Sequence, residues 1–354
     1  MCSGSYTILH RFLKPKVFLS LMFVKWAQVT IAKEKALLNK VKRINMSHAS
    51  PKIVVVGSIN CDIVTYLKQF PQPNETVFAH GYEIAIGGKG LNQAVAAKRL
   101  GAQVSMIGCI GDDDFGRQAC AHLLANGVNC DSVMVSDMTP TGVATIAVND
   151  AGDNMISVAS GANLALTVAH VMAFRELIES ADVLITQSEV SVDVMTCALE
   201  IANGAGVKSI LNPAPANKTV LPLLKFCTYI TPNESETQTL SGFYPEGDAD
   251  IAKAIANLSA QGASNIVITC GSRGSLIHNG DTLISVAPYK VVSVDSTGAG
   301  DVFNGAFAVG IASGMSAPDA ARQASAAAAI SVTRKTADSA PTRSELDAFV
   351  SKHA

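Results

Sequence analysis

The hydrophobic pattern from Lys52 onward alternates between short apolar runs and longer amphipathic stretches. The run KIVVVGSIN is typical of a buried strand that ends in a tight turn, and GLNQAVAAKRLG of an Ala-rich amphipathic helix that ends at Gly101. QVSMIGCIG predicts the next strand, and a helix is predicted over 114–126. The alternation continues with strands at 182–186, 207–212, 228–233 and 265–271, and with helices around 168–180, 192–204, 234–241, 248–261 and 317–332. This order predicts an α/β fold whose parallel sheet is covered by helices on both faces.

Two regions depart from this rhythm, because their polar and apolar residues alternate with a period of two. The first covers 62–88, and the second covers 141–163 and is typical of a hairpin that turns at Asn149–Gly152. Strands with one polar side do not belong in a sheet that is buried on both faces. We therefore expect a small separate sheet beside the main domain, where it acts as a lid.

The first 50 residues are predicted to lie outside the fold, which we assign to residues 51–354. Residues 1–46 carry nine Lys and Arg but a single acidic residue, Glu34. The apolar run at 17–24 is too short to span a bilayer. Basic residues precede it, which is compatible with a signal or transit peptide, but no small-residue cleavage site follows. We favour an extension outside the fold, such as sequence translated ahead of a start at Met46.

Charge and cysteine content narrow the functional classes. The net charge is −2 in total, so the chain beyond the basic extension is acidic, which argues against general nucleic-acid binding. The eight cysteines are scattered singly, without a CxxC pair or zinc-like spacing. They are typical of reduced core thiols, so we expect a cytoplasmic protein that binds neither nucleic acid nor membrane.

The glycine-rich segment VDSTGAGDVFNGAF at 294–307 is the first candidate for chemistry. Glycines permit conformations that turn successive N–H groups towards an anion, and the helix that follows adds its partial positive charge. Such a loop suits a transferring phosphoryl group. Asp301 stands where a substrate hydroxyl would approach, and the helix N-terminus should keep its carboxylate ionised. On spacing alone, an ordinary helix cap is an equally good interpretation of Asp301.

Two clusters in the first half of the chain suit ligand binding. Asn60 and Asp62 follow the first strand, where ligands bind in open α/β sheets, and their donors and acceptors suit sugar hydroxyls. An Asx turn has the same sequence pattern. The segment IGGKGLNQAVAA at 86–97 sets Lys89 among glycines and Asn92 in the first helical turn. Lys89 suits phosphate binding, although a solvated surface charge has the same appearance.

Two further clusters lie in the second half. In TPNESE, Asn233 and Glu236 are three residues apart after a strand. Glu236 suits magnesium held through water, whereas the same spacing is also that of a capping box. TCGSRG at 269–274 is a strand end and a turn where phosphates can bind, and alone it is only a turn. The chain has no P-loop motif and no complete G-x-G-x-x-G after the first strand, which argues against both of those nucleotide sites.

Taken in this order, the clusters resemble the PfkB-type carbohydrate kinases, from about Lys52 to Lys352. The segments GGKGLNQAVAA and DSTGAGDVFNGAF match the family's two signatures in the right order. The resemblance implies a three-layer α/β/α sandwich with a mostly parallel central sheet and a small protruding β-sheet lid. It implies ATP-dependent phosphorylation of D-ribose at O5, with Mg²⁺ and K⁺ as cofactors and a homodimer formed through the lid sheet.

The resemblance also assigns the site residues, in four groups. The catalytic group is the base Asp301 with an anion hole over Gly298, Ala299 and Gly300. The ribose group is Asn60, Cys61, Asp62, Gly88, Lys89, Gly90, Leu91, Asn92, Glu189 and Asp301. The ATP group is Asn233, Thr269, Cys270, Gly271, Ser272, Arg273, Gly274, Gly300, Asp301 and Ser325. The monovalent-cation group is Asp295, Thr297, Ser331, Arg334, Thr336 and Ser339, several through backbone oxygen, while Glu236 is assigned to Mg²⁺ through water.

The chain departs from the family pattern at a few positions. Thr336 stands where close relatives carry Gly, and the loop around it is one residue shorter, which bears on the cation ligands Thr336 and Ser339. Leu91 replaces a usual Ala and Ser296 a usual Thr, and both changes look tolerable. Cys61 occupies a small-residue position between two sugar ligands.

Several alternatives stay open at this point. One changed contact is enough to move the preference from ribose to deoxyribose or another sugar, because a single hydroxyl decides it. A nucleoside kinase is disfavoured, since GSINCD is polar where a base needs apolar cover. A non-catalytic sugar-binding regulator on the same fold is a rival from another class. A nicotinamide oxidoreductase is a weaker one, because the dinucleotide motif is missing.

Overall fold

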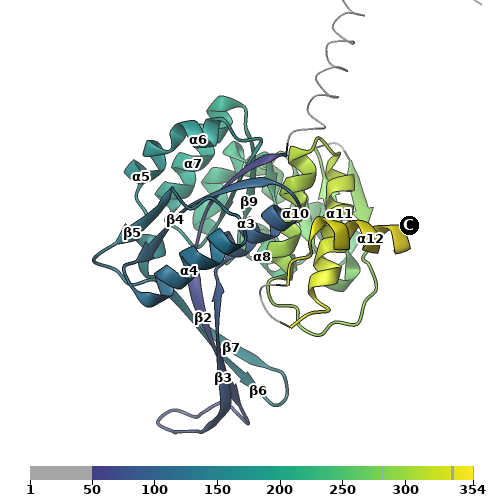
Figure 1. Cartoon of the computed structure of the whole chain (residues 1–354). Coiled ribbons are helices and arrows are strands. Elements are labelled where there is room, and N and C mark those ends of the chain that lie inside the picture. Colours follow the sequence, from purple (N-terminus) through teal and green to yellow (C-terminus); the bar gives the residue numbers. More distant parts are fainter. Residues whose placement is uncertain (1–49, 281, 336–338, 354) are drawn as a thin grey trace, which may run out of the picture. The chain divides into compact units, whose positions relative to one another are not determined.

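A nine-stranded sheet runs through the centre of the structure (Figure 1), a computed structural model that describes residues 50–280, 282–335 and 339–353. The strands lie in the order β13 (Leu283–Val286), β12 (Ser275–His278), β11 (Ile266–Thr269), β10 (Tyr229–Ile230), β9 (Lys208–Asn212), β8 (Val183–Gln187), β1 (Lys52–Val56), β4 (Gln103–Gly111) and β5 (Val133–Ser136). The pairs from β11 to β5 are parallel, and only β12 and β13 run antiparallel at one edge. The predicted mostly parallel sheet is confirmed.

Ten helices cover the two faces of this sheet in the described part of the chain. They are α3 (Lys89–Arg99), α4 (Asp114–Ala125), α5 (Val168–Ala173), α6 (Arg175–Glu179), α7 (Val192–Ala205), α8 (Glu234–Ser241), α9 (Asp248–Ala260), α10 (Ala299–Ala312), α11 (Ala317–Ser331) and α12 (Arg343–His353). Successive side chains of a strand point to opposite faces of the sheet, so each face has its own hydrophobic core. In β1, Ile53 and Val55 belong to the first core, and Val54 and Val56 belong to the second. Helices α3, α4 and α10–α12 pack on the first face, and α5–α9 on the second, so the sandwich has three layers.

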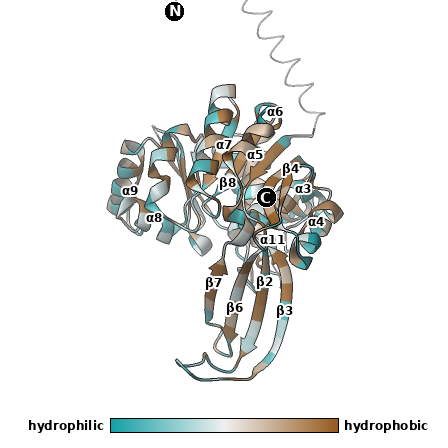
Figure 2. Ribbon diagram, turned by 90° about the vertical axis from the view of Figure 1, so that its left-hand side faces the viewer, coloured by the Kyte–Doolittle hydropathy of each residue, from teal (hydrophilic) through white to brown (hydrophobic). Residues whose placement is uncertain are grey.

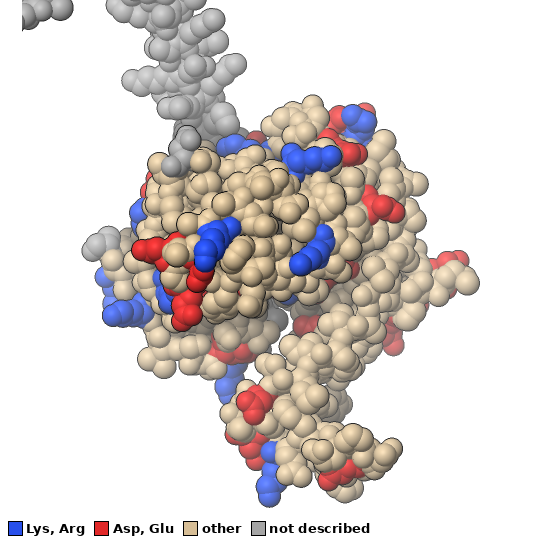
Figure 3. Space-filling model, turned by 180° about the vertical axis from the view of Figure 1, so that it is seen from behind, with Lys and Arg blue, Asp and Glu red and all other residues tan. Residues whose placement is uncertain are grey.

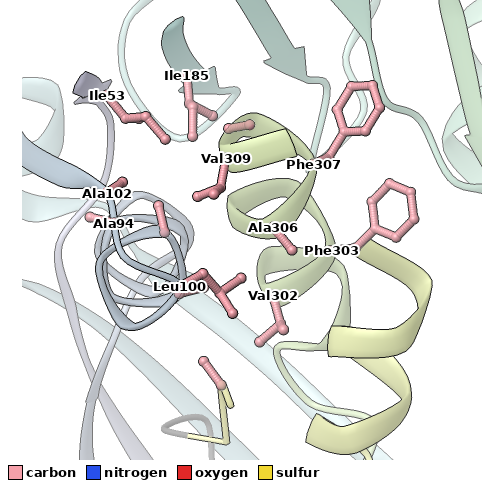
Figure 4. Close-up of a cluster of buried hydrophobic side chains, with 14 of the residues drawn as sticks. Ile53, Ala94, Leu100, Ala102, Ile185, Val302, Phe303, Ala306, Phe307 and Val309 are labelled. Carbon is pink, nitrogen blue, oxygen red and sulfur yellow. The ribbon is translucent and has the colours of Figure 1, made fainter. Parts of the chain in front are cut away.

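Helices α10 and α3 pack closely, and this contact positions the site. Figure 4 shows Val302 and Ala306 of α10 turned towards Leu100, the C-cap residue of α3, among buried side chains of the first core. A Cβ at Gly305 would lie 2.7 Å from the carbonyl oxygen of Gln93, so only glycine fits where the helices touch. The small residues therefore allow the first turn of α10 to approach the first turn of α3.

Four strands form a second sheet that projects from the main body in the order β3 (Ala79–Gly87), β2 (Asn60–Leu67), β6 (Gly142–Asn149) and β7 (Asn154–Ala159), as Figure 2 shows. The predicted hairpin is present, since the N–H of Gly152 donates to the carbonyl of Asn149 at 2.9 Å. The sheet is mixed, because β2 and β6 are parallel while the outer pairs are antiparallel. The separate lid sheet expected from the period-two pattern is confirmed.

The structure differs from the predicted elements in three places. The helix expected over 168–180 is interrupted at Phe174 and forms α5 and α6. The strand expected over 228–233 has only two paired residues, because Asn233 already caps α8. The hydrophobic pattern did not predict the short edge strands β5, β12 and β13. Expectations about residues 1–49 fall outside the described residues.

Two properties of the surface and helices bear on partners. No helix in the described ranges has both the length and the apolar composition for crossing a bilayer. On the face shown in Figure 3, Lys and Arg side chains are scattered among Asp and Glu.

Candidate active site

Asp301 lies in the first turn of α10, and its side chain is buried. Gly298 precedes the helix in a left-handed conformation, with φ of 74°, and no side chain caps the helix. The N–H groups of Gly300 and Asp301 have no acceptor among the described residues, whereas the N–H of Ala299 donates to the Ser296 carbonyl at 3.2 Å. The N–H of Gly298 likewise has no acceptor among the described residues, so the open donors are those of Gly298, Gly300 and Asp301, and within the predicted hole over 298–300 only the Ala299 N–H is engaged. The interpretation of Asp301 as a simple cap is wrong.

Two amides of α3 hold the Asp301 carboxylate. Gln93 Nε2 donates to Oδ1 at 2.9 Å, and Asn92 Nδ2 donates to Oδ2 at 3.3 Å. Burial raises the pKa of Asp301, while nearby Lys89 and these two hydrogen bonds oppose the rise. The sequence predicted that the helix N-terminus would favour the ionised form, but burial is the larger effect in the folded protein.

Lys89 is the positive charge at the centre of this site. Its ammonium interacts with the carboxylates of Asp301, Glu189, Glu236 and Asp62, and these raise its pKa above the usual value although burial works against them. The pKa of Asp62 is raised to about 6, first by burial and then by repulsion from Glu189 and Asp301. The interpretation of Lys89 as a solvated surface charge is therefore wrong, because four carboxylates from separate segments face it.

Asn60 is the first residue of the lid strand β2, so the Asx-turn interpretation is wrong. Its Oδ1 accepts from Asn163 Nδ2 at 2.7 Å. Asn163 is held in turn by the backbone of Ile59. Its Nδ2 donates to the Ile59 carbonyl at 3.1 Å, and its Oδ1 accepts from the Ile59 N–H at 2.8 Å. Since the Ile59 N–H must donate to Asn163 Oδ1, Asn163 offers its amide N–H groups to Asn60. Asn60 consequently presents Nδ2, a donor, to any ligand.

Ser58 and Glu189 join the lid to the main sheet. Ser58 Oγ donates to Glu189 Oε2 at 2.5 Å, and the backbone N–H of Lys89 reaches the same oxygen at 3.3 Å. Glu189, which follows β8, is thereby fixed beside the start of α3. A Cβ at Gly90 would lie 2.6 Å from the Ser58 nitrogen, and Gly88 has a φ of 95°, so both glycines are required by the close approach.

Two residues of the predicted ribose group turn their side chains elsewhere. Cys61 alternates with Asn60 and Asp62 along β2, so its side chain lies on the opposite face of the strand, and it is buried. Leu91 is buried in the first core. Contacts from Cys61 or Leu91 to a sugar are thus limited to the backbone, and the Leu91 N–H already donates to the Ser58 carbonyl.

Asn233 and Glu236 form the capping box that was one of the two sequence interpretations. Asn233 Oδ1 accepts from the Glu236 N–H, and Glu236 Oε2 accepts from the Asn233 N–H, both at 2.8 Å. Burial raises the pKa of Glu236, and Lys89 and Asp301 both act on it electrostatically. The start of α8 therefore lies beside the site, with Glu236 Oε1 and Asn233 Nδ2 left without hydrogen bonds in the described part of the chain.

The predicted ATP segment lies next to Asn233, because Asn233 and Thr269 form a parallel bridge. Residues 270–274 make a tight turn in which the Cys270 N–H donates to the Gly274 carbonyl at 2.8 Å. Arg273, predicted as part of the ATP group, is already engaged, since its guanidinium pairs with Glu234 and bonds to the carbonyls of 245 and 246. Ser272 is exposed in the same turn, and Ser325 is partly buried on α11.

The two segments predicted to bind the monovalent cation are joined. The N–H groups of Val294 and Asp295 both donate to the Val332 carbonyl, at 2.7 and 3.1 Å. Asp295 Oδ1 accepts from the Thr297 N–H at 2.8 Å. The further predicted ligands are Ser331, whose Oγ donates to the Ala328 carbonyl, and Arg334, whose guanidinium binds the Ser339 and Ala340 carbonyls and Glu345. Thr336 lies outside the described residues.

Ser339 is buried, and its Oγ has no hydrogen-bond partner within the described residues. A buried hydroxyl without a partner costs free energy, so a ligand for it would stabilise this loop. The carbonyls of Ser339 and Ala340 add backbone oxygens beside the Arg334 guanidinium, and no cluster of three His, Cys, Asp or Glu side chains suits a transition metal in the described ranges. The donor set fits a weakly bound monovalent cation.

Sequence reasoning missed four polar residues that support the site. Gln93, Ser58, Asn163 and Asn212 are each buried or nearly so, and each makes hydrogen bonds across long sequence separations. Gln93 stands next to Asn92 in the recognised motif. It is a polar residue on the side of α3 that faces the core, and this was the available signal for its role in the site. Asn163 and Asn212 carry no local signal, because their partners come from segments distant in the sequence.

The comparisons with known proteins agree with this geometry. The family model described as pfkB family carbohydrate kinase matches residues 50–343, and the chain belongs to that family. The ribokinase of Haemophilus influenzae is 38% identical over 299 residues, which cover 84% of this chain and 98% of that protein. The deoxyribokinase of Salmonella typhi is 34% identical, with coverage of 84% and 98%.

A solved structure of the Arabidopsis thaliana ribokinase, complexed with ribose and ATP, matches with a TM-score of 0.79 at 30% identity. The match covers 85% of this chain and 99% of that one. Within the family, the chain is thus similar to ribokinases, and the expected three-layer α/β/α fold with a small separate sheet is confirmed.

Proposed function

We propose that this protein is an ATP-dependent sugar kinase that transfers a phosphoryl group to O5 of D-ribose, the reaction of ribokinases. The observation that carries the proposal is the position of Asp301 at the uncapped N-terminus of α10, beside Lys89 and Asn92. A base and an anion-binding set of N–H groups thus meet where residues assigned to the sugar converge. The relatives named above support ribose and ATP as the substrates.

The proposed mechanism is in-line transfer. Asp62 and Glu189 accept from sugar hydroxyls, and Asn60 Nδ2 donates to one, which orients O5 towards Asp301. The O5–H proton passes to Asp301 as O5 bonds to the γ-phosphorus, and the bond from phosphorus to the β,γ-bridging oxygen breaks with its electron pair leaving on ADP. The N–H groups of Gly300 and Asp301 and the ammonium of Lys89 stabilise the charge on the phosphoryl oxygens.

ATP is proposed to lie along Asn233 and the turn at 269–274, with Gly300 at its γ-phosphate. Thr269, Cys270, Gly271, Ser272 and Gly274 are retained as backbone or side-chain contacts, together with Ser325 on α11. Arg273 is given a different role from the one expected, because its pairing with Glu234 and the carbonyls of 245 and 246 uses its donors to hold the loop between α8 and α9.

Magnesium and potassium are proposed as cofactors. Glu236 keeps Oε1 available after capping α8, which fits Mg²⁺ held through water; bound with ATP, the ion would neutralise phosphate charge. The segments around Asp295 and at 331–335, with Ser339, offer mostly backbone and hydroxyl oxygens, including Ser339 Oγ, which has no partner among the described residues, and this fits K⁺. A cation there would support the loop that leads into α10.

A homodimer and a cytoplasmic location are proposed as well. On the lid face opposite Asp62, the register places Tyr82 and Ile84 beside Thr65 and Ile63, and both are substantially exposed. Met155 lies on the same face through its pairing with Ala147, and it too is exposed. A second copy of the lid would cover this apolar face. All seven cysteines in the described ranges are free thiols, which supports a reducing compartment.

Deoxyribose is the second candidate substrate, favoured by the 34% identity to a deoxyribokinase. The two sugars differ by one hydroxyl, and a site that hydrogen-bonds that hydroxyl rejects the analogue that lacks it. A non-catalytic sugar-binding regulator is the rival from another class.

The test is an assay of ADP release by the full chain with ribose, deoxyribose, fructose 6-phosphate and adenosine, each with and without potassium. Turnover of ribose that rises with potassium supports the proposal together with the cation site. Turnover of deoxyribose alone would change the proposed substrate but would leave the proposed phosphoryl transfer in place. Absence of turnover with measurable ribose binding would favour the regulator.

A further inference from the structure

Gln93 is a fully buried amide directly behind the Asp301 carboxylate. Its Nε2 uses both hydrogens, donating to Asp301 Oδ1 at 2.9 Å and to Asn212 Oδ1 at 3.0 Å. Its Oε1 accepts from Gln187 Nε2 at 2.8 Å. Both hydrogens and the oxygen of this buried amide therefore have partners, whereas Oε1 of Gln187 has none among the described residues.

The orientation of the Gln93 amide follows from its neighbours. An ionised carboxylate only accepts, so Nε2 must face Asp301. A rotated amide would set Oε1 against the carboxylate and would bring two NH₂ groups together at Gln187. Asp301 and Asn212, which both offer an acceptor oxygen, thus lock Gln93 in the one orientation that donates to Oδ1. Gln187, at the end of β8, only donates to the remaining Gln93 oxygen.

A second branch holds the backbone of the same helical turn. Thr231, which follows β10, donates through Oγ1 to Asn304 Oδ1 at 2.6 Å, and Asn304 Nδ2 donates to the Gly300 carbonyl at 2.8 Å. Asn212 Nδ2 reaches the Thr231 carbonyl at 3.3 Å and so connects the two branches. Three neighbouring strand ends therefore support the first turn of α10 and its carboxylate.

The two oxygens of Asp301 are unequal in this arrangement. Oδ1 accepts a short bond from a residue with no exposed surface. Oδ2 accepts a longer bond, 3.3 Å, from Asn92, which is only partly buried and belongs to the residues assigned to the sugar. Oδ2 is therefore the oxygen on the side from which a substrate can approach.

We propose that Gln93 is a positioning residue that holds Asp301 by Oδ1 and thereby assigns the proton of the sugar hydroxyl to Oδ2. The inference rests on the proposed kinase function for the identity of the proton donor. In the step, the sugar O–H bond breaks, the proton goes to Oδ2, the new O–P bond forms, and the electron pair of the broken P–O bond leaves on ADP. Gln93 exchanges no proton and touches no substrate.

The pKa of Asp301 distinguishes the two possible roles of Gln93, because a merely structural role of Gln93 would leave it unchanged. Lys89 and Asn92 from α3, Asp62 from β2, Glu189 after β8 and Glu236 from α8 also face this site. None of these is changed when Gln93 loses its donor. Withdrawal of one hydrogen bond from the carboxylate should raise its pKa.

The experiment compares the full chain with Gln93→Met and with the control Gln187→Met. Gln187→Met also unpairs a buried amide of the network but leaves both hydrogen bonds to Asp301 in place. The Asp301 carboxyl is titrated by NMR after labelling of aspartate at Cγ, and its signal is assigned by its loss in Asp301→Asn. Initial rates with ribose are measured on the same samples.

The expected result for Gln93→Met is an Asp301 midpoint raised by about 0.5 to 1 pH unit and a kcat lowered about 10- to 100-fold, with KM for ATP within twofold. Gln187→Met should leave the midpoint close to that of the parent. Should Gln93→Met not fold, Gln93→Asn keeps an amide but is one methylene too short to reach Asp301, and the same shift is expected.

Equal midpoints in the parent and the folded Gln93 variant would overturn the proposal, as would equal shifts in the Gln93 and Gln187 variants. The NMR titration needs no turnover. A parent chain inactive on every sugar would therefore refute the kinase proposal, while the comparison of midpoints would still decide the role of Gln93.

Discussion

Several carboxylates in this site repel one another and are attracted to the ammonium group of Lys89. The carboxylates of Asp62, Glu189, Glu236 and Asp301 share one ammonium group, and burial raises the pKa of three of them. Desolvated like charges oppose folding, so such a cluster is typical of a functional site rather than of a stabilising one. The raised pKa of Asp301 also suits a base, because a carboxylate that binds a proton more strongly accepts it more readily.

Asp301→Asn should lower kcat by about a thousandfold or more while changing KM for ATP little, because general-base catalysis contributes about 10²- to 10⁴-fold and the amide cannot accept the proton. The measurement is the ADP-release assay with ribose. Asp319→Asn is the matched control, since Asp319 occupies the same position in the first turn of α11 but is exposed. Near-normal turnover in Asp301→Asn would refute the assignment of the base.

Asp62 should make stability and sugar binding depend on pH in opposite senses. Its folded pKa of about 6 exceeds the ordinary value of 3.8, so between these pH values the folded state binds more protons than the unfolded state. Stability from this group therefore falls as pH rises through that window, and the penalty is complete above pH 6. Affinity for the sugar should instead weaken as pH falls below 6, because the protonated group is a poorer acceptor.

The test is thermal unfolding of Asp62→Asn against the parent across pH 4 to 8. At pH 7.5 the variant should be more stable by on the order of 1 kcal/mol, and the gain should shrink as the pH approaches 4. Asp137→Asn, an exposed substitution, should show no such pH-dependent difference. A gain that is constant with pH would contradict the role of the Asp62 charge.

Whole elements bring the site together through the contact of α10 with α3. Gly305 lies one helical turn beyond Asp301, and it lets the two backbones approach so that Asp301 reaches Asn92 and Gln93. The catalytic geometry therefore depends on a small residue that has no chemistry of its own.

Gly305→Ala should destabilise the fold by about 1–3 kcal/mol and lower kcat, because the added Cβ would meet Gln93 O at 2.7 Å and Ala96 Cβ at 2.8 Å. Thermal unfolding and the kinase assay measure the two effects. Gly204→Ala is the control on α7, where nothing lies within 4 Å of the added Cβ, and a slight stabilisation is expected there. Equal behaviour of the two variants would show that the close approach is not required.

The hydrophobic pattern predicted most of these elements but not their supporting contacts. Helices α3, α4, α7, α8 and α9 lie close to their expected ranges, because each has a periodic apolar face and a clear cap or breaker. Strand β10 was overestimated, since its apolar residues continue into the polar cap of α8. Strands β12 and β13 were missed because four residues give too short a pattern to recognise.

At the scale of the whole molecule, the lid sheet has an apolar face that the other described residues leave exposed. Ile84 is 49% exposed in β3, on the face opposite Asp62. A second copy would bury this face and would also fix the strand that carries Asn60 and Asp62. Dimer formation is thus proposed to support sugar binding, because both involve strand β2.

Ile84→Lys should convert a dimer into a monomer, because a charge on this face opposes its burial. Light scattering coupled to size exclusion measures the mass directly. Leu283→Lys is the control, since Leu283 is also 49% exposed but lies at the edge of the main sheet. A parent that is already monomeric at micromolar concentration would contradict the proposed dimer.

The sequence by itself determined most of the elements and the family and indicated the candidate reacting groups, because helix and strand periods, glycine turns and the two signature segments are local properties of the chain. Only the tertiary structure decided that Asn163 turns the Asn60 amide, that Gln93 holds Asp301 and itself accepts from Gln187, and that Arg273 is engaged by Glu234. Those partners are separated by 39 to 208 positions in the chain. Hydrogen-bond geometry between them exists only once the strand ends and helix starts have met at one edge of the sheet.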